Sequence, residues 1–172
     1  KVVQLPLPKE SEYRYAQCEP SIAIHPKNPK IMIAGSLLND YYYSKNGGKR
    51  WKSKSLKSTF GVFGDPVLIF DTLGRPYYFH LSSYEATSHL DRIICQSADK
   101  VCKEFDNGTF PKPSGTKVQD KHWVIANPFT NDLYMTWTQF DGYNSADPKD
   151  SSIIVFSKSS DQGKSWSDPL RI

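Results

Sequence analysis

The sequence is poor in cysteine and histidine, the side chains that most often close disulfide frameworks or bind zinc. Its three cysteines are Cys18, Cys95 and Cys102, and an odd number without a CxxC pair gives neither a complete disulfide framework nor a zinc motif. Cys95 and Cys102 either face each other across a short hairpin, which would indicate an oxidising compartment, or are buried thiols. The four histidines are scattered, so we expect no metal ion and no cofactor.

Long apolar runs and a one-sided charge balance are also missing. No stretch approaches the roughly 18 apolar residues that a membrane span needs. The 22 basic and 18 acidic residues are mixed along the chain, and no basic stripe with interleaved aromatic residues stands out. The sequence therefore predicts neither a membrane span nor a nucleic-acid-binding surface.

Turn-forming and aromatic residues, by contrast, are plentiful. The 12 prolines and 10 glycines are spread along the chain, and aromatic residues make up 13% of it. Disordered chains are poor in aromatic residues, and regularly spaced turn formers are typical of many short strands. We expect an all-β fold.

A short pattern occurs twice in the chain and survives in part a third time. Residues Ser44–Trp51 and Ser159–Trp166 both read Ser-x-Asp/Asn-x-Gly-x-x-Trp, each after an apolar, strand-like run. A damaged copy, Ser97–Asp99, lacks the glycine and the tryptophan. The repeating unit is therefore about 50–60 residues long, in the range of propeller blades.

The upstream part of each unit also aligns. Glu19–Ile24 matches Asp65–Phe70 and Lys121–Ala126, and each segment is followed by a polar turn and a second strand-like run. Each unit thus reads as four antiparallel strands, as a β-propeller blade requires. We expect about three blades, at residues 18–62, 63–117 and 118–172, with residues 1–17 as an outer strand of another blade.

The repeated octapeptide has a structural logic. An Asp or Asn in a tight turn accepts hydrogen bonds from backbone amides, glycine permits a positive φ, and tryptophan fills the space beside adjacent hairpins. The residues predicted to have this structural role are Ser44, Asn46, Gly48, Trp51, Ser159, Asp161, Gly163 and Trp166.

These octapeptides resemble the Asp boxes, or BNR repeats, of sialidases and sialidase-like propellers. The resemblance covers nearly everything from Cys18 to Ile172 and implies a closed ring, for which we expect about six blades. It also implies an exo-glycosidase that removes terminal sialic acid or related sugars. Non-catalytic propellers that bind glycans or proteins carry the same boxes, and they are the alternative.

The chain does not match the catalytic pattern of the sialidase family. Family members use a tyrosine nucleophile assisted by a glutamate, an aspartate acid/base and three arginines that hold the substrate carboxylate. The Arg-Ile-Pro motif that usually carries the first arginine is absent, and only Arg14 closely precedes a blade opening. This departure leaves catalysis by the chain an open question and favours the binding alternative.

The resemblance nevertheless implies where a site would lie. In such propellers the entries to the innermost strands gather on one face, and the Asp boxes lie on the opposite side. The loops 81–90 and 140–151 are expected on the site face as well. The expected catalytic candidates are Asp120, Asp65 and Glu19, and the expected substrate-binding residues are Lys121, His122 and Arg14. The alternative is that the carboxylates only cap strand ends.

Three blades do not close a ring. They leave open edges and apolar faces, so we expect the remaining blades or a second copy of the chain to complete the propeller. The expected ligand is a glycan or small sugar, and the family resemblance implies a secreted, periplasmic or cell-surface protein.

Overall fold

The structure is a computed structural model that describes residues 2–8, 17–82, 90–101 and 103–172. Within these ranges the chain forms eleven strands. The strands are β1 (Ser21–Ile24), β2 (Met32–Ser36), β3 (Asp40–Ser44), β4 (Lys52–Ser55), β5 (Val67–Phe70), β6 (Pro76–Ser82), β7 (Arg92–Ser97), β8 (Val118–Ala126), β9 (Leu133–Phe140), β10 (Ser152–Ser159) and β11 (Leu170–Arg171). None of the described residues belongs to a helix that could cross a membrane.

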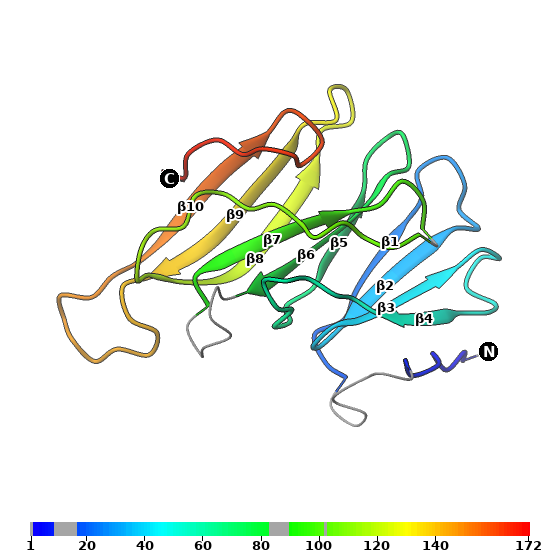
Figure 1. Ribbon diagram of the computed structural model, residues 1–172, viewed down its shortest axis with the longest axis horizontal. Coiled ribbons are helices and arrows are strands. Elements are labelled where there is room, and N and C mark those ends of the chain that lie inside the picture. Colours follow the sequence, from blue (N-terminus) through cyan, green and yellow to red (C-terminus); the bar gives the residue numbers. More distant parts are fainter. Residues whose placement is uncertain (1, 9–16, 83–89, 102) are drawn as a thin grey trace.

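The strands form three separate antiparallel sheets that stand side by side (Figure 1). The first sheet has the order β1-β2-β3-β4, the second β5-β6-β7, and the third β8-β9-β10-β11. Strands adjacent in a sheet are always adjacent in sequence, which is the meander of propeller blades. The all-β propeller prediction, with about three blades, is therefore confirmed. The exact blade boundaries and the total number of blades stay predictions.

The second sheet has three named strands, and its fourth position is filled by a single bridge between Cys95 and Thr109. This difference coincides with the damaged octapeptide. Without the glycine and tryptophan, Ser97 does not begin the regular turn; its N–H and hydroxyl donate instead to the carboxylate of Asp106, at 3.1 and 2.8 Å. The segment after β7 therefore runs back along this strand irregularly, and it pairs with β7 only through the bridge between Thr109 and Cys95.

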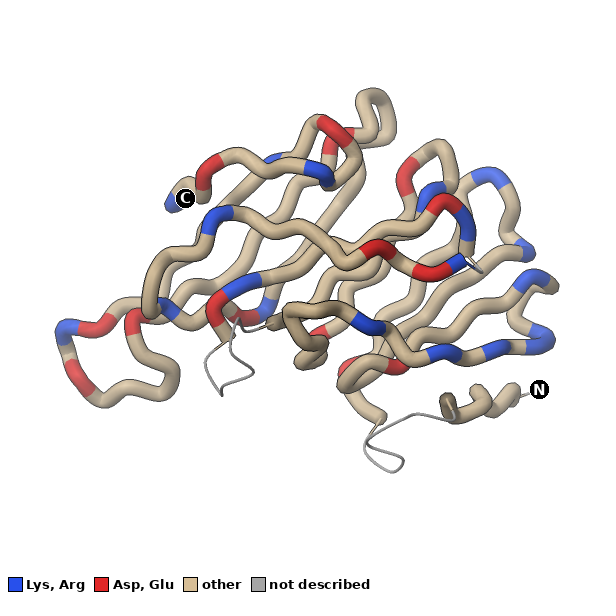
Figure 2. The backbone as a smooth tube through the Cα atoms, in the orientation of Figure 1, with Lys and Arg blue, Asp and Glu red and all other residues tan. Residues whose placement is uncertain are grey.

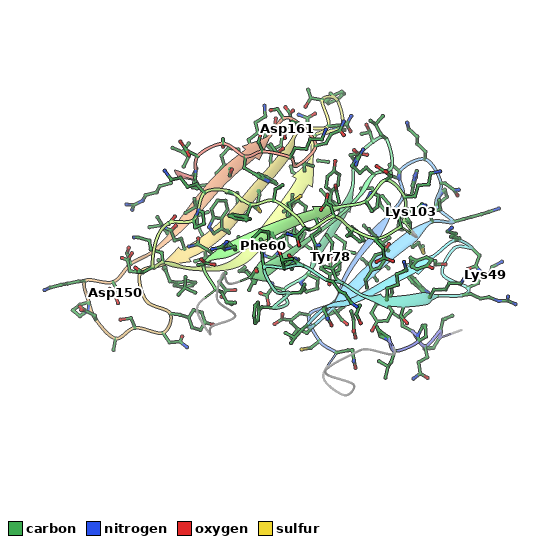
Figure 3. All side chains as sticks on the ribbon, viewed as in Figure 1. Lys49, Phe60, Tyr78, Lys103, Asp150 and Asp161 are labelled. Atoms are coloured by element: carbon green, nitrogen blue, oxygen red, sulfur yellow. The ribbon has the colours of Figure 1, made fainter. Side chains whose placement is uncertain are left out.

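Two apolar layers hold the three sheets together. Ile33, Tyr41, Leu68 and Tyr78 fill the layer between the first and second sheets. The layer between the second and third sheets contains Tyr77, Phe79, Leu133, Met135, Trp137 and Val155. Adjacent residues of a strand point to opposite faces, so Tyr77 and Tyr78 enter different layers. Tyr78 lies near the centre of the molecule (Figure 3).

Both complete octapeptides form the same hydrogen-bonded turn. In the first, Gly48 N–H donates to Ser44 Oγ at 3.0 Å, and Arg50 N–H donates to Asn46 Oδ1 at 2.9 Å. In the second, Gly163 N–H donates to Ser159 Oγ at 2.9 Å, and Ser165 N–H donates to Asp161 Oδ1 at 2.9 Å. Gly48 and Gly163 have φ of 77° and 81°, which a residue with a side chain rarely adopts.

The two tryptophans of these turns have different partners. Trp51 Nε1 donates to Gly48 O at 3.0 Å within its own turn. Trp166 Nε1 donates to Thr109 Oγ1 at 3.1 Å, and its ring lies edge-on to Phe79, with centroids 6.1 Å apart. Trp166 therefore links the third sheet to the second.

Residues 2–8 contain no strand. Pro6, Leu7 and Pro8 lie beside β4, where they line a groove of about 630 Å³ together with Trp51 and lysines of that strand. Basic residues follow one another along β4 and the turn before it, whereas acidic and basic residues are scattered over the remaining backbone (Figure 2).

Candidate functional site

The site is built from the residues that open the innermost strand of each sheet. Glu19 precedes β1, Asp65 precedes β5, and Lys121 lies within β8, at equivalent positions of the repeat. Their φ angles are 52°, 50° and 47°. Such values are uncommon outside glycine and cost roughly 1–3 kcal/mol each. The same backbone kink therefore occurs three times at one end of the sheets.

In the third sheet this kink takes the form of a bulge. The pairing of β8 with β9 shifts register between Asp120 and Trp123, so that Lys121 and His122 have no partners in the ladder. A bulge re-aims side chains locally. Lys121 is exposed, His122 is buried and Trp123 is again exposed.

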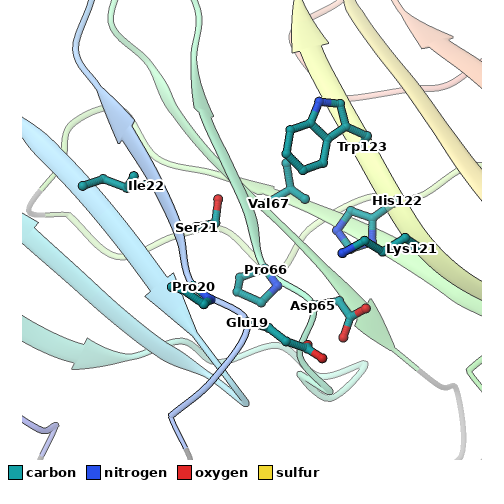
Figure 4. A pocket seen from close by; sticks show the side chains of 10 residues that line it. All are labelled: Glu19, Pro20, Ser21, Ile22, Asp65, Pro66, Val67, Lys121, His122 and Trp123. Atoms are coloured by element: carbon teal, nitrogen blue, oxygen red, sulfur yellow. The ribbon is translucent and has the colours of Figure 1, made fainter.

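These strand entries enclose a cavity of about 330 Å³ (Figure 4). Glu19 and Asp65 lie next to each other on one side of it, and Lys121 and His122 face them from the third sheet. The lining residues are Glu19, Pro20, Ser21, Ile22, Asp65, Pro66, Val67, Lys121, His122 and Trp123. None of these is an arginine.

Glu19 and Asp65 form a carboxyl pair. Burial, a side-chain hydrogen bond to Glu19 and the negative charges of Glu19 and Asp120 together raise the pKa of Asp65 from 3.8 to about 7, against the opposing effect of Lys121. Two carboxylates this close cannot both ionise easily, so the pair retains a proton between its members.

Asp120 has a local role. Its Oδ1 accepts a hydrogen bond from the backbone N–H of Lys121 at 2.7 Å, so it stabilises the bulge. Asp120 is half-buried and does not line the cavity. The residue at the position equivalent to Glu19 and Asp65 is Lys121, so the third sheet contributes a cation where the other two contribute acids.

His122 is 2% exposed, and neither ring nitrogen makes a hydrogen bond of normal geometry to a described residue. Burial, together with the nearby His80 and Lys121, lowers its pKa to about 3, against the opposing effect of the Phe79 backbone. His122 is therefore neutral at physiological pH and carries an unsatisfied polar atom at the cavity. His80, which is also buried, has an oxygen near each ring nitrogen: its Nδ1 lies 2.9 Å from Leu81 O and its Nε2 lies 3.1 Å from Gln96 Oε1, and the N–H of the neutral ring donates to one of these oxygens.

The structure thus brings together four of the six residues proposed from the sequence: Glu19, Asp65, Lys121 and His122. Arg14 lies outside the described residues, as does most of the loop 81–90. Sequence reasoning missed Trp123 as a cavity residue, although the repeat alignment placed it next to His122. Within the described residues no cluster of His, Cys, Asp and Glu could hold a metal ion.

The octapeptide turns lie at the other end of the sheets. The strands alternate in direction, so the turn between β3 and β4 and the one between β10 and β11 are remote from the beginning of β1. Figure 3 places Asp161 at this far end of the third sheet. Cys95 is a buried free thiol and Cys18 an exposed one, and Cys102 is outside the described residues.

No family model and no curated protein matches the sequence, but solved structures resemble the fold. An α-L-arabinofuranosidase from Fusarium graminearum superposes with a TM-score of 0.61 at 12% identity, over 89% of this chain and 49% of that one. An α-L-arabinanase from Penicillium chrysogenum superposes with a TM-score of 0.60 at 13% identity, over 89% of this chain and 49% of that one.

A bacterial enzyme and a sialidase are similar as well. An α-L-arabinofuranosidase from Lactobacillus brevis superposes with a TM-score of 0.56 at 14% identity, over 90% of this chain and 53% of that one. A Hadza microbial sialidase superposes with a TM-score of 0.50 at 13% identity, over 83% of this chain and 33% of that one. The chain spans about half the length of the two arabinofuranosidases and the arabinanase. It therefore has the β-propeller fold that these glycoside hydrolases share.

Proposed function

We propose that this chain is part of a propeller-type exo-glycoside hydrolase of the sialidase-like, Asp-box kind, with its sugar site at the strand-entry cavity. The carboxyl pair of Glu19 and Asp65 in that cavity is the observation that carries the proposal. Glycoside hydrolysis requires one carboxyl group that donates a proton and one carboxylate that assists attack. The proposal includes a secreted, periplasmic or cell-surface location.

Asp65 has the properties of the general acid. A carboxyl group with a pKa of about 7 is still largely protonated in mildly acidic solution, and it can release its proton to the leaving glycosidic oxygen. Glu19, the other carboxyl group of the pair, has the role of the base that accepts a proton from an attacking water. The substrate and the attacking water would replace the hydrogen bond between the two carboxyl groups, because glycosidases in which a carboxylate activates water place the two carboxyls about 6.5–9.5 Å apart.

The cavity charges favour an uncharged sugar over a sialic acid. The carboxyl pair, with its shared proton, and Lys121 roughly offset each other. No arginine lines the described cavity to pair with a sugar carboxylate. A sialoside carboxylate would instead approach the carboxyl pair of Glu19 and Asp65. A furanoside or pyranoside without charge meets no such repulsion.

The non-catalytic alternative rests on Trp123. Its side chain is 63% exposed at the cavity, and an exposed indole offers an apolar face to a sugar ring. A binding propeller would need this face and Lys121 but not the proton shared by Glu19 and Asp65.

The test is a turnover assay on a panel of fluorogenic glycosides, including an α-L-arabinofuranoside, other uncharged exo-linked sugars and a sialoside. Asp65→Asn and Glu19→Gln are compared with Asp99→Asn, whose side chain is 85% exposed in an ion pair with Arg75. The proposal expects turnover of an uncharged glycoside that falls at least about 100-fold in the first two variants and is unchanged in the third.

Turnover that survives both variants would overturn the assignment of the acid pair. Sugar binding without turnover, weakened by Trp123→Ala and Lys121→Ala but not by Asp65→Asn, would establish the binding alternative. Turnover of the sialoside alone would overturn the preference for uncharged sugars.

A further inference from the structure

The outermost strand of the first sheet, β4, turns backbone groups away from the sheet. In its antiparallel pairing with β3, Leu56 N–H donates to Asn39 O at 2.7 Å. Hydrogen-bonded and non-hydrogen-bonded pairs alternate along such a ladder, so the register makes Lys54 the next residue that bonds to β3. The N–H and C=O groups of Ser53 and Ser55 therefore point to the outer side of β4.

Among the described residues, no hydrogen bond reaches the outer backbone groups of Ser53 and Ser55. The segment that lies beside them is Pro6–Pro8. Its first and last residues are prolines, which have no N–H to donate, so this segment stands beside β4 without pairing to it. The N–H and C=O groups of Ser53 and Ser55 are thus available to an added strand.

The groove of about 630 Å³ runs between this segment and β4. Its volume lies in the range of ligand-binding pockets. Pro8 is buried and Leu7 is 46% exposed, so one wall offers an apolar contact. The other wall is the open edge of a strand. A groove with an open strand edge on one side fits an extended peptide, which pairs through its backbone and places alternate side chains on the two sides.

The groove is also positively charged. Every charged residue from 45 to 57 is a lysine or an arginine (Figure 2), and Lys52, Lys54 and Lys57 line the groove. Glu104, the acid among the described lining residues, bonds to Lys54 at 2.5 Å and is 83% exposed at the rim. Lysines on an edge strand oppose pairing with an uncharged or basic strand, whereas they attract an acidic one.

The position of β4 in the blade keeps this edge open however many blades complete the ring. Blades of a propeller surround a central channel, and the innermost strand of the first sheet is β1, so β4 lies at the outer rim. Successive sheets pack through their faces, as the two apolar layers show. Figure 1 shows β4 at the margin of the molecule. A further blade would therefore cover a face of the first sheet and leave its outer edge exposed.

We propose that the edge of β4 binds an extended acidic peptide segment of a partner protein, which adds a fifth strand to the first sheet. The peptide backbone would bond to the outer groups of Ser53 and Ser55, and its acidic side chains would meet Lys52 and Lys54. Backbone bonds supply affinity in this mode of recognition, and the lysines select an acidic sequence. The groove shares no lining residue with the strand-entry cavity, so the inference does not rest on the proposed function.

The test is fluorescence anisotropy with a labelled, end-capped peptide in which glutamate and valine alternate. The alternation places all of its carboxylates on one face of the added strand. The control peptide has lysine in place of glutamate and keeps the same spacing of valines. The proposal expects saturable binding of the acidic peptide below about 1 mM and no measurable binding of the basic peptide in the same range.

Two pairs of variants separate the backbone contribution from the charge contribution. Ser53→Pro removes the outward N–H, which the folded chain does not use, and Ser53→Ala retains it. Proline is tolerated on an edge strand where the N–H faces outward, and circular dichroism verifies that each variant is folded. Lys52→Glu reverses a charge at the groove. Lys149→Glu reverses one at an exposed lysine in the loop between β9 and β10.

Ser53→Pro should weaken binding of the acidic peptide at least about 5-fold, because one hydrogen bond is lost. Lys52→Glu should weaken it at least about 3-fold at low salt, and less at high salt. Ser53→Ala and Lys149→Glu should bind like the wild type. Amide hydrogen exchange of the wild type needs no substitution: the amides of Ser53 and Ser55 should exchange more slowly when the peptide is bound.

Several results would overturn the proposal. These are the absence of saturable binding, equal affinity for the two peptides, and binding that Ser53→Pro leaves unchanged. A wild-type dimer that Ser53→Pro converts to a monomer in sedimentation equilibrium would assign the edge to a second copy of the chain instead. Binding of an oligogalacturonate without binding of the peptide would assign the groove to an anionic sugar.

Discussion

Glu19 and Asp65 share a hydrogen bond across the boundary between two sheets. Each follows a different stretch of chain and opens a different innermost strand, and each has a positive φ. The kinked backbone turns both side chains toward the same cavity, where Lys121 of the third sheet faces them (Figure 4). The cavity is therefore a product of the repeat, with one side chain from each sheet.

The first prediction concerns stability against pH. The pKa of Asp65 is raised from 3.8 to about 7 in the folded chain, so the folded state holds a proton that the unfolded state releases. This contribution is complete below about pH 4 and is lost as the pH rises to about 7. Asp65→Asn should remove this pH dependence, because the side-chain amide does not titrate. As the pH rises from about 4 to about 7, the free energy of unfolding of the variant should therefore increase by about 1–3 kcal/mol relative to that of the wild type, after a discount for the partial exposure of Asp65.

Urea unfolding of both proteins at several pH values measures this difference. Asp99→Asn, which changes an exposed carboxylate, is the control and should follow the wild type. A difference between wild type and Asp65→Asn that does not vary with pH would contradict the shared proton.

The second prediction separates two buried histidines. Neither ring nitrogen of His122 has a hydrogen-bond partner of normal geometry, whereas each ring nitrogen of His80 lies within hydrogen-bond distance of an oxygen, to one of which the neutral ring donates. His122→Leu should therefore be neutral or stabilising at pH 7, whereas His80→Leu should cost about 1–3 kcal/mol because it removes the hydrogen bond that the neutral ring donates to Leu81 O or Gln96 Oε1. Thermal unfolding at pH 7 compares the two variants directly. Equal losses would contradict the difference in their surroundings.

The same histidines predict acid sensitivity. Burial lowers the pKa of His80 to about 4 and that of His122 to about 3. Their stabilising contribution is complete above the ordinary value of about 6.5 and is lost as the pH falls toward 4 and 3. His122→Leu should therefore lose less stability than the wild type between pH 6.5 and 4. A parallel loss in both proteins would count against a neutral His122.

The third prediction compares two glycines with positive φ. Gly163 has a φ of 81°, and a Cβ there would lie 2.9 Å from Cys95 Sγ; Gly47 has a φ of 70° and no heavy atom within 4 Å of that position. Gly47→Ala should cost only the backbone strain, about 1–2 kcal/mol. Gly163→Ala should cost about 1–3 kcal/mol more because of overpacking. Chemical denaturation measures both, and equal costs would show that the turn moves away from Cys95.

The fourth prediction concerns the two repeat tryptophans. Trp166→Ala removes contacts with Phe79 and Thr109 in the second sheet and should cost about 3 kcal/mol. Trp51→Ala removes a hydrogen bond within its own turn and should cost about 1 kcal/mol. Guanidinium unfolding ranks the two variants. The reverse order would contradict the bridging role of Trp166.

The sequence by itself determined the repeat and, through it, the architecture. The octapeptides Ser44–Trp51 and Ser159–Trp166 are local signals, because a side chain and backbone amides within a few residues form the whole turn. The alternation of apolar residues likewise assigns Tyr77 and Tyr78 to opposite layers. The single bridge that replaces a fourth strand in the second sheet follows the damaged copy at Ser97, whose loss was already visible in the sequence.

Only the tertiary structure decided how the site is assembled. Glu19, Asp65 and Lys121 are far apart in the chain, and their chemistry depends on distances that packing between sheets determines. The proton shared by Glu19 and Asp65 arises from burial and proximity, and the neutral His122 arises from burial beside His80. Asp120, a catalytic candidate by sequence, hydrogen-bonds to the adjacent backbone because the bulge in β8 places Lys121 at the cavity instead. Local patterns specify turns and strands, whereas electrostatic coupling between residues of different sheets exists only once the sheets are packed together.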